Sequence, residues 1–112
     1  MKLIDKPITK IELQYMANAS FGNFVKAVVD VVRRIMAIDG SLHSDEEAYL
    51  LSLGSDQANL WGINLYSELT GEDFIEFDSM INVRPQQGNM SRGVDNPLTQ
   101  NRIREVVHSL IT

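Results

Sequence analysis

Hydrophobic and polar residues alternate along one stretch of the chain, from Asp73 to Gly93. Its first half has the period of two that is typical of a β-strand. One face of this strand is mostly apolar and consists of Ile75, Phe77, Ser79, Ile81 and Val83. The other face carries Phe74, Glu76, Asp78, Met80, Asn82 and Arg84. Because side chains two apart on a strand point the same way, we expect a strand that runs to Arg84 and presents two acids, an amide and an arginine together.

The first helix is predicted from the capping residues at its N-terminus. Thr9 has the position of an N-cap and Glu12 that of its capping-box partner, while Ile8 is placed to pack on Leu13. Apolar residues then follow at helical spacing, and Gly22 is the expected end of the helix.

Two further helices have similar signals. Ser44 to Glu47 form a second capping box with acids in the first turn, and Gly54 is expected to end that short helix. Asn96 as N-cap and Pro97 in the first turn open the last helix. Its apolar stripe consists of Ile103, Val106, Val107, Leu110 and Ile111.

The segment from Val25 to Ile38 fits two structures. Several of its apolar residues have helical spacing, but five valines and two isoleucines favour strand, because branching at Cβ restricts side chains in a helix and suits a pleated surface. A single strand of this length would exceed the usual ~5–6 residues. We therefore expect a bend or hairpin near Arg33.

A second alternating run extends from Leu60 to Tyr66, and a short link joins it to the strand at Phe74. This arrangement predicts an antiparallel hairpin in which Asn64 lies on the same face as Glu76. The element order predicts a single domain over residues 1–112. Its fold class is α+β, with an antiparallel sheet of about four strands and three short helices packed mainly on one face. The connection from Pro85 to Asn96 is long, and such loops tend to be functional or disordered.

Composition excludes several classes of protein. The chain has no cysteine, so disulfides, zinc-thiolate sites, iron–sulfur clusters and thiol nucleophiles are excluded. The first residues lack the apolar core of a signal peptide, and no apolar run approaches the ~20 residues of a bilayer span. A cytoplasmic location without membrane contact is expected. The net charge of -5 argues against nucleic-acid binding, which depends on lysine and arginine.

The charges are distributed unevenly. Between Ile35 and Val83 there is no lysine or arginine, although ten acids fall there, and Arg84, Arg92 and two further arginines follow. The two regions could attract each other within a subunit or across a dimer, and ordinary solvated charge is the simpler interpretation.

Two groups of residues are candidates for chemistry. His43 and Asp45 could ligate a metal, although acids are also what any first helical turn prefers. Glu76 and Asp78 could share a proton and act as a general acid, or could be ion-paired with Arg84. No G-x-S-x-G elbow supports a hydrolase triad.

The loop after the strand is a candidate anion cradle. Its guanidinium groups and free backbone N–H groups suit phosphate or carboxylate, yet its spacing matches neither a P-loop nor a dinucleotide fingerprint. The residues concerned are Arg84, Gly88, Asn89, Ser91, Arg92 and Gly93. The aromatic residues Trp61, Tyr66, Phe74 and Phe77 are interpreted as core or dimer contacts rather than a base-stacking platform, because their strands are acidic.

Several runs together resemble one known family, the domain of unknown function 5674. They are PITKIELQYMA, VKAVVDV, LHSDEEAYLL, LWGINLY, FIEFDSMINVRPQQGN with SRGV, and the final helix ending SLI. The resemblance covers Pro7 to the end, and DSMINVRPQQGN is its most specific part. It implies a stand-alone short protein, mostly of bacterial origin, with no assigned activity and no catalytic motif.

The sequence therefore favours a noncatalytic interaction module that forms a homodimer and recognises an unknown protein or a small anionic ligand. Its expected recognition surface comprises Asn64, Asp78, Asn82, Arg84, Asn89, Ser91 and Arg92. The alternative is a small enzyme or ligand-binding protein that acts on an anionic or metal-bound small molecule, with Glu76, Asp78 and His43 as candidate catalytic residues. No cofactor is indicated.

Overall fold

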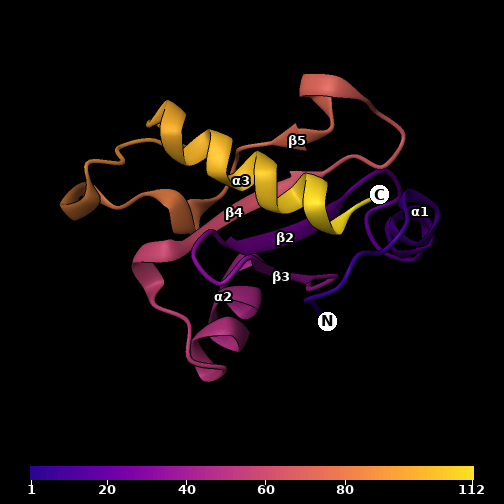
Figure 1. The fold of residues 1–112 in the computed structure, drawn as a ribbon, viewed down its shortest axis with the longest axis horizontal. Helices are drawn as coiled ribbons and strands as arrows, with labels where there is room; N and C mark the ends of the chain where they lie inside the picture. The colour runs from indigo at the N-terminus through magenta and orange to yellow at the C-terminus, as the bar shows by residue number, and fades with distance from the viewer.

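The computed structural model describes all 112 residues and contains one antiparallel sheet with three α-helices (Figure 1). The strands are β1 (Lys2–Ile4), β2 (Val25–Asp30), β3 (Ile35–Ile38), β4 (Leu60–Leu65) and β5 (Ile75–Glu76), in the spatial order β1-β3-β2-β4-β5. The helices are α1 (Lys10–Ala19), α2 (His43–Ser52) and α3 (Pro97–Leu110). The predicted α+β class is confirmed. The sheet has five strands rather than about four, since β1 is too short to show an alternating pattern.

The segment from Val25 to Ile38 forms a hairpin, as its β-branched residues indicate. Strands β2 and β3 pair antiparallel, with Asp30 opposite Ile35. No glycine is needed at the turn, because Oδ1 of Asp30 accepts hydrogen bonds from the backbone N–H groups of Val32 and Arg33. Arg34 takes the left-handed conformation that closes the turn, with φ +57°.

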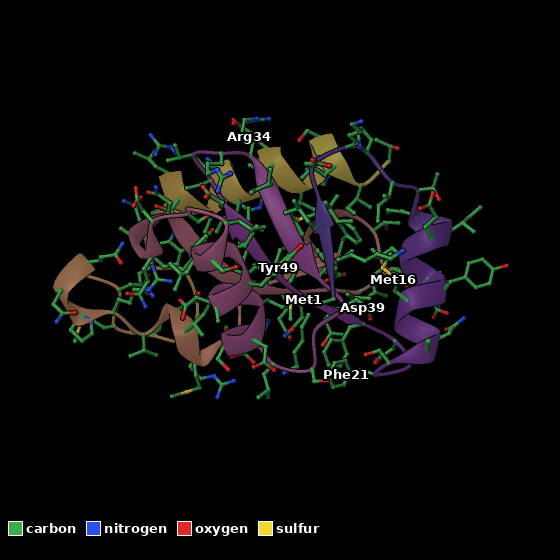
Figure 2. All side chains as sticks on the ribbon, turned by 90° about the horizontal axis from the view of Figure 1, so that it is seen from below. Met1, Met16, Phe21, Arg34, Asp39 and Tyr49 are labelled. Carbon is green, nitrogen blue, oxygen red and sulfur yellow. The ribbon has the colours of Figure 1, made fainter.

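Helices cover both faces of the sheet. Helices α1 and α3 pack on one face around a cluster of 20 buried residues, among them Leu13, Val29 and Ile103. Helix α2 packs on the other face, where Leu50 joins Val28, Ala37 and Leu60. Figure 2 shows α3 on one side of the strands and α2, with Tyr49, on the other. Two helices thus share the expected face. The third lies opposite, because the central strands are apolar on both sides.

Two of the three predicted helix starts are confirmed. The backbone N–H of Glu12 donates to the Thr9 hydroxyl at 3.1 Å, and that of Leu98 donates to the Asn96 side chain at 2.9 Å. The capping box at Ser44 is wrong, because α2 begins at His43, with Leu42 as an N-cap that offers no side-chain hydrogen bond.

The prediction of a strand up to Arg84 is wrong beyond β5. The hairpin itself is confirmed, with Asn64 opposite Glu76 and Leu65 opposite Ile75. The chain then leaves the sheet and forms 3₁₀ turns at Met80–Asn82 and Pro85–Gln87.

The Asn82 side chain takes the place of the missing strand. Its Oδ1 accepts the backbone N–H of Gly62 at 2.8 Å, and its Nδ2 donates to the Gly62 carbonyl at 2.9 Å. Both backbone groups at this edge of β4 are therefore satisfied by an amide that mimics a peptide group. No helix is long and apolar enough to cross a membrane.

Candidate functional site

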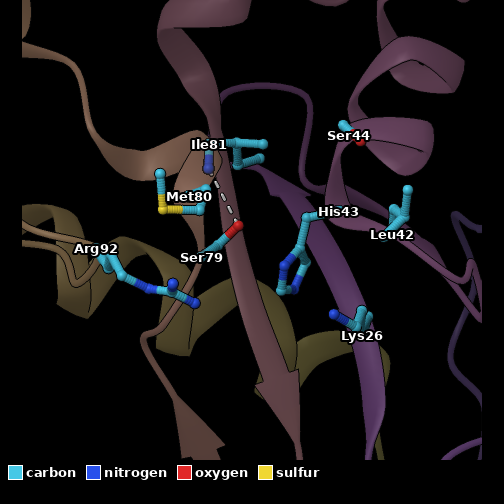
Figure 3. Close-up of a pocket in the computed structure, with 8 residues that line it drawn as sticks. All are labelled: Lys26, Leu42, His43, Ser44, Ser79, Met80, Ile81 and Arg92. Carbon is cyan, nitrogen blue, oxygen red and sulfur yellow. Dashed lines mark hydrogen bonds between the residues drawn. The ribbon is translucent and has the colours of Figure 1, made fainter.

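A pocket of about 180 Å³ opens on the face of the sheet that α2 covers. It lies between the first turn of α2 and the segment that follows β5 (Figure 3). The residues that line it are Lys26, Leu42, His43, Ser44, Ser79, Met80, Ile81 and Arg92.

His43 forms the centre of this pocket. Its ring lies between Ser79 and Lys26 (Figure 3), and the residue is 8% exposed. Nε2 lies 2.7 Å from the backbone carbonyl oxygen of Ile63. Because a carbonyl oxygen only accepts hydrogen bonds, Nε2 carries the hydrogen, and Nδ1 of the neutral ring keeps its lone pair. No protein group bonds to Nδ1, so it is free to accept a hydrogen bond in the pocket.

The surroundings of His43 keep its ring neutral at pH 7. Burial lowers the pKa of His43 below 6.5, and the nearby charges of Lys26 and Arg92 lower it further. The hydrogen bond to Ile63 and the charge of Asp78 act in the opposite direction and are outweighed by burial.

Two cations flank the ring. Lys26 lies on β2, opposite Asn64 of β4. Nε of Arg92 donates to Oδ1 of Asp78 at 2.7 Å, and both side chains are about half exposed. The terminal nitrogens of Arg92 have no protein acceptor. Because Asp78 balances one of the two cations, about one unit of positive charge remains at the pocket mouth.

The first turn of α2 adds backbone donors. The N–H groups of His43 and Ser44 have no acceptor, and the side chain of Leu42 supplies none. The start of a helix also carries partial positive charge. Two cations, free backbone N–H groups and a histidine nitrogen without a protein partner thus lie at one pocket, an arrangement that suits an anionic group bearing a proton.

Of the residues proposed from sequence, the structure brings His43, Asp78 and Arg92 together. It adds Lys26 and Ser79, which sequence reasoning missed. Lys26 became recognisable only through the pairing of β2 with β4, which places it beside Asn64 on the polar side of the sheet. Ser79 lies against Gly62, where the missing side chain makes room for it.

Several other residues that were predicted to form the recognition surface are instead bonded to nearby backbone groups. Arg84 is 8% exposed and donates to the carbonyl oxygens of Ile81, Gln57 and Leu60. Nδ2 of the buried Asn89 lies 2.7–3.1 Å from the carbonyl oxygens of Asn82, Ser91 and Gly93, which share its two hydrogens.

Asn82 is likewise fully buried, and the Ser91 hydroxyl binds Asp95. The loop after Pro85 is therefore ordered by its own polar side chains.

Asn64 donates to Glu76 at 2.8 Å, which confirms that they share a face, and Tyr66 also donates to Glu76.

The charged regions meet within the chain. Arg84 lies 3.8 Å from Glu47, and Arg92 lies 2.7 Å from Asp78, so both ion pairs join the acidic middle to the arginine-rich end. His43 and Asp45, the candidate metal ligands, are two residues apart on a helix and point in different directions. No three histidine or acidic side chains gather in a way that could hold a metal ion.

Two other depressions have less suitable linings. One contains Arg104 and His108 together with Glu72, and Arg104 already bonds to Asn101 and lies over the Phe77 ring. The next is lined by Glu72, Asp73 and Glu76, which would repel an anion. Both are larger, at about 350 and 310 Å³.

Comparison with known proteins gives one match. The model of a family described as "Protein of unknown function (DUF5674)" matches residues 2–110. No curated protein and no solved structure shows significant similarity to the chain.

Proposed function

The chain belongs to the DUF5674 family of proteins of unknown function, and we propose that it binds a small anionic molecule in the pocket around His43. Phosphate and carboxylate groups are the chemistry that the lining fits. The observation that carries the proposal is the buried His43 ring, whose Nδ1 has no protein partner while Lys26 and Arg92 flank it.

The fixed tautomer of His43 supports this proposal. Nδ1 of His43 has a lone pair and no protein partner, so it is available to accept a hydrogen bond from a ligand. A ligand that carries a hydroxyl or a protonated oxygen can donate to Nδ1, while its charged oxygens accept from Lys26, Arg92 and the first N–H groups of α2. One ligand would thus satisfy every free group of the pocket.

The pocket is small enough to set the size of the ligand. Ligand sites for drug-sized molecules usually enclose about 300–1,000 Å³, whereas this one holds about 180 Å³. A single anionic group with a few further atoms fits, and a nucleotide does not.

The predicted homodimer and cytoplasmic location remain predictions. The pocket is built from one chain, so binding needs no second copy. A noncatalytic interaction module is compatible with the pocket if the anion is a side chain of a partner. Native mass spectrometry of the untagged protein would report subunit number and any retained ligand in one spectrum.

Titration of ¹⁵N-labelled protein with inorganic phosphate and with acetate tests the proposal. Phosphate at pH 7 keeps a protonated oxygen that can donate to Nδ1, whereas acetate can bind only through the cations and the N–H groups. We expect saturable shifts of the amide resonances of Leu42 to Ser44 and of Arg92. Replacing Lys26 by methionine keeps the apolar stem and removes the charge, and should weaken binding about tenfold, as expected for loss of a charged hydrogen bond near the surface. Arg92→Gln should act similarly.

Arg102→Gln is the matched control, because Arg102 is an exposed arginine on α3 that does not line the pocket. It should leave the affinity unchanged. If neither anion causes saturable shifts at the pocket, or if Arg102→Gln weakens binding as much as Arg92→Gln, the proposed function is wrong.

A further inference from the structure

The rim of the pocket also carries apolar side chains, beside the cations at its mouth. Leu42 is 55% exposed and Met80 is 65% exposed, and both line the pocket, together with the half-buried Ile81. In Figure 3, Leu42 and Met80 lie on opposite sides of the His43 ring. Single exposed apolar side chains are common on protein surfaces. Here, however, they border the pocket in which Nδ1 of His43 has no protein partner.

Leu42 also breaks a local rule. It is the N-cap residue of α2, a position at which serine, threonine, aspartate and asparagine are strongly preferred and leucine is disfavoured. Its side chain leaves the first N–H groups of the helix unbonded and projects into solvent. Residues that break a local rule without a structural gain are expected at functional sites.

We propose that the ligand is an amphiphilic anion, in which a phosphate or carboxylate head binds beside His43 and a short apolar chain lies between Leu42 and Met80. This inference rests on the proposed function, since it needs the head group to bind. The apolar chain replaces water on the two exposed side chains, and methionine suits such contacts because its unbranched, polarisable side chain adapts to irregular shapes.

Two homologous series test the inference with defined probes. Affinities are measured by NMR titration for inorganic phosphate against butyl phosphate, and for acetate against pentanoate. Full burial of one methylene tightens binding about fourfold. Because a rim covers only one side of the chain, we expect about a twofold gain per methylene, and therefore about an eightfold gain from acetate to pentanoate.

Substitutions at the rim test whether Leu42 and Met80 cause this gain in affinity. Leu42→Ala keeps a poor N-cap residue and Met80→Ala changes an exposed side chain, so neither should disturb the fold. Each should reduce the gain in affinity that a longer apolar chain gives. Met90→Ala is the matched control, because Met90 is 68% exposed and lies outside the pocket. It should keep the full gain.

The outcomes separate this inference from the proposed function. Suppose that phosphate and acetate bind at the pocket but longer chains bind no tighter, or that the gain persists in the Leu42→Ala/Met80→Ala double variant. Either result would refute the proposal of an amphiphilic ligand and leave the proposed anion binding intact. If no probe binds at the pocket, both are wrong.

Discussion

Replacing the buried Glu46 by glutamine should change how stability depends on pH. Glu46 is fully buried on α2, where Oε2 accepts the backbone N–H of Gly40 at 3.0 Å and Oε1 has no partner. Burial raises the pKa of this carboxyl from 4.5 to about 9, although the Gly40 hydrogen bond and the charge of Lys26 lower it in part. The folded protein therefore keeps a proton on Glu46 at pH 7.

The sign of the effect follows from proton linkage. Between the unfolded pKa of 4.5 and the folded pKa of about 9, only the folded state holds this proton. The contribution of Glu46 to stability is thus fully present below pH 4.5, and it falls by about 1.4 kcal/mol per pH unit above that value. At pH 7 the loss amounts to about 3 kcal/mol.

Glutamine keeps an oxygen that accepts from Gly40 and has no proton to lose. We expect Glu46→Gln to match the natural protein at pH 4 and to exceed its unfolding free energy by about 3 kcal/mol at pH 7. Urea titrations at several pH values between 4 and 8 measure this difference. Asp45→Asn, at the exposed neighbouring position, should show no gain that grows with pH. A Glu46→Gln difference that is the same at pH 4 and pH 7 would refute the reasoning.

Three further substitutions test the packing around the pocket and the capping of α3. Asn82→Ala leaves both backbone groups of Gly62 unpaired, so the unfolding free energy in urea should fall by about 3 kcal/mol; a loss below about 1 kcal/mol would contradict the role of this amide as a substitute for a strand. Gly62→Ala would place a Cβ atom 2.6 Å from the Ser79 side chain and should lower the melting temperature. Adding Ser79→Gly should restore it, and failure to do so would show that the clash lies elsewhere. Asn96→Ala removes the hydrogen bond from Leu98 and should cost about 1 kcal/mol in the same urea assay, whereas no change would mean that the cap contributes nothing.

The charge state of His43 gives a further expectation for ligand binding. Because burial lowers the pKa of His43, protonation adds a positive charge among Lys26, Asp78 and Arg92 only as the pH falls below that pKa. Affinity for sulfate, whose own charge is constant between pH 5 and pH 8, should therefore rise once the pH falls below the pKa of His43. If the affinity does not change at the pH at which ¹⁵N NMR shows the ring gaining its second proton, His43 does not take part in binding.

Local signals predicted the parts of the fold that depend on neighbouring residues. Thr9 and Asn96 accept hydrogen bonds from backbone N–H groups no more than three residues further along the chain. The valines of β2 favour a strand through their own branched side chains. The family resemblance is likewise confirmed by the match over residues 2–110.

The errors arose where a side chain bonds to backbone distant in sequence. Ser44 has the position of an N-cap with Glu47 as its capping-box partner, yet α2 begins at His43, and the carboxyl of the neighbouring Glu46 accepts from the backbone of Gly40 in the preceding loop. Asn82 has a place in an alternating pattern, but its amide pairs with Gly62, 20 residues away, and ends the strand. Lys26 could be linked to His43 only through the register of β2 with β4, which alternation alone does not specify.

The most direct measurement of the central claim is the ¹⁵N NMR spectrum of the His43 ring during titration with inorganic phosphate at pH 7. We expect the free protein to carry hydrogen on Nε2 and none on Nδ1. Phosphate should cause a saturable shift of the Nδ1 resonance, and the affinity obtained from that shift should fall about tenfold in Lys26→Met. An Nδ1 resonance that does not respond to phosphate, or a ring that carries its hydrogen on Nδ1, would contradict the claim that this pocket binds an anion through His43.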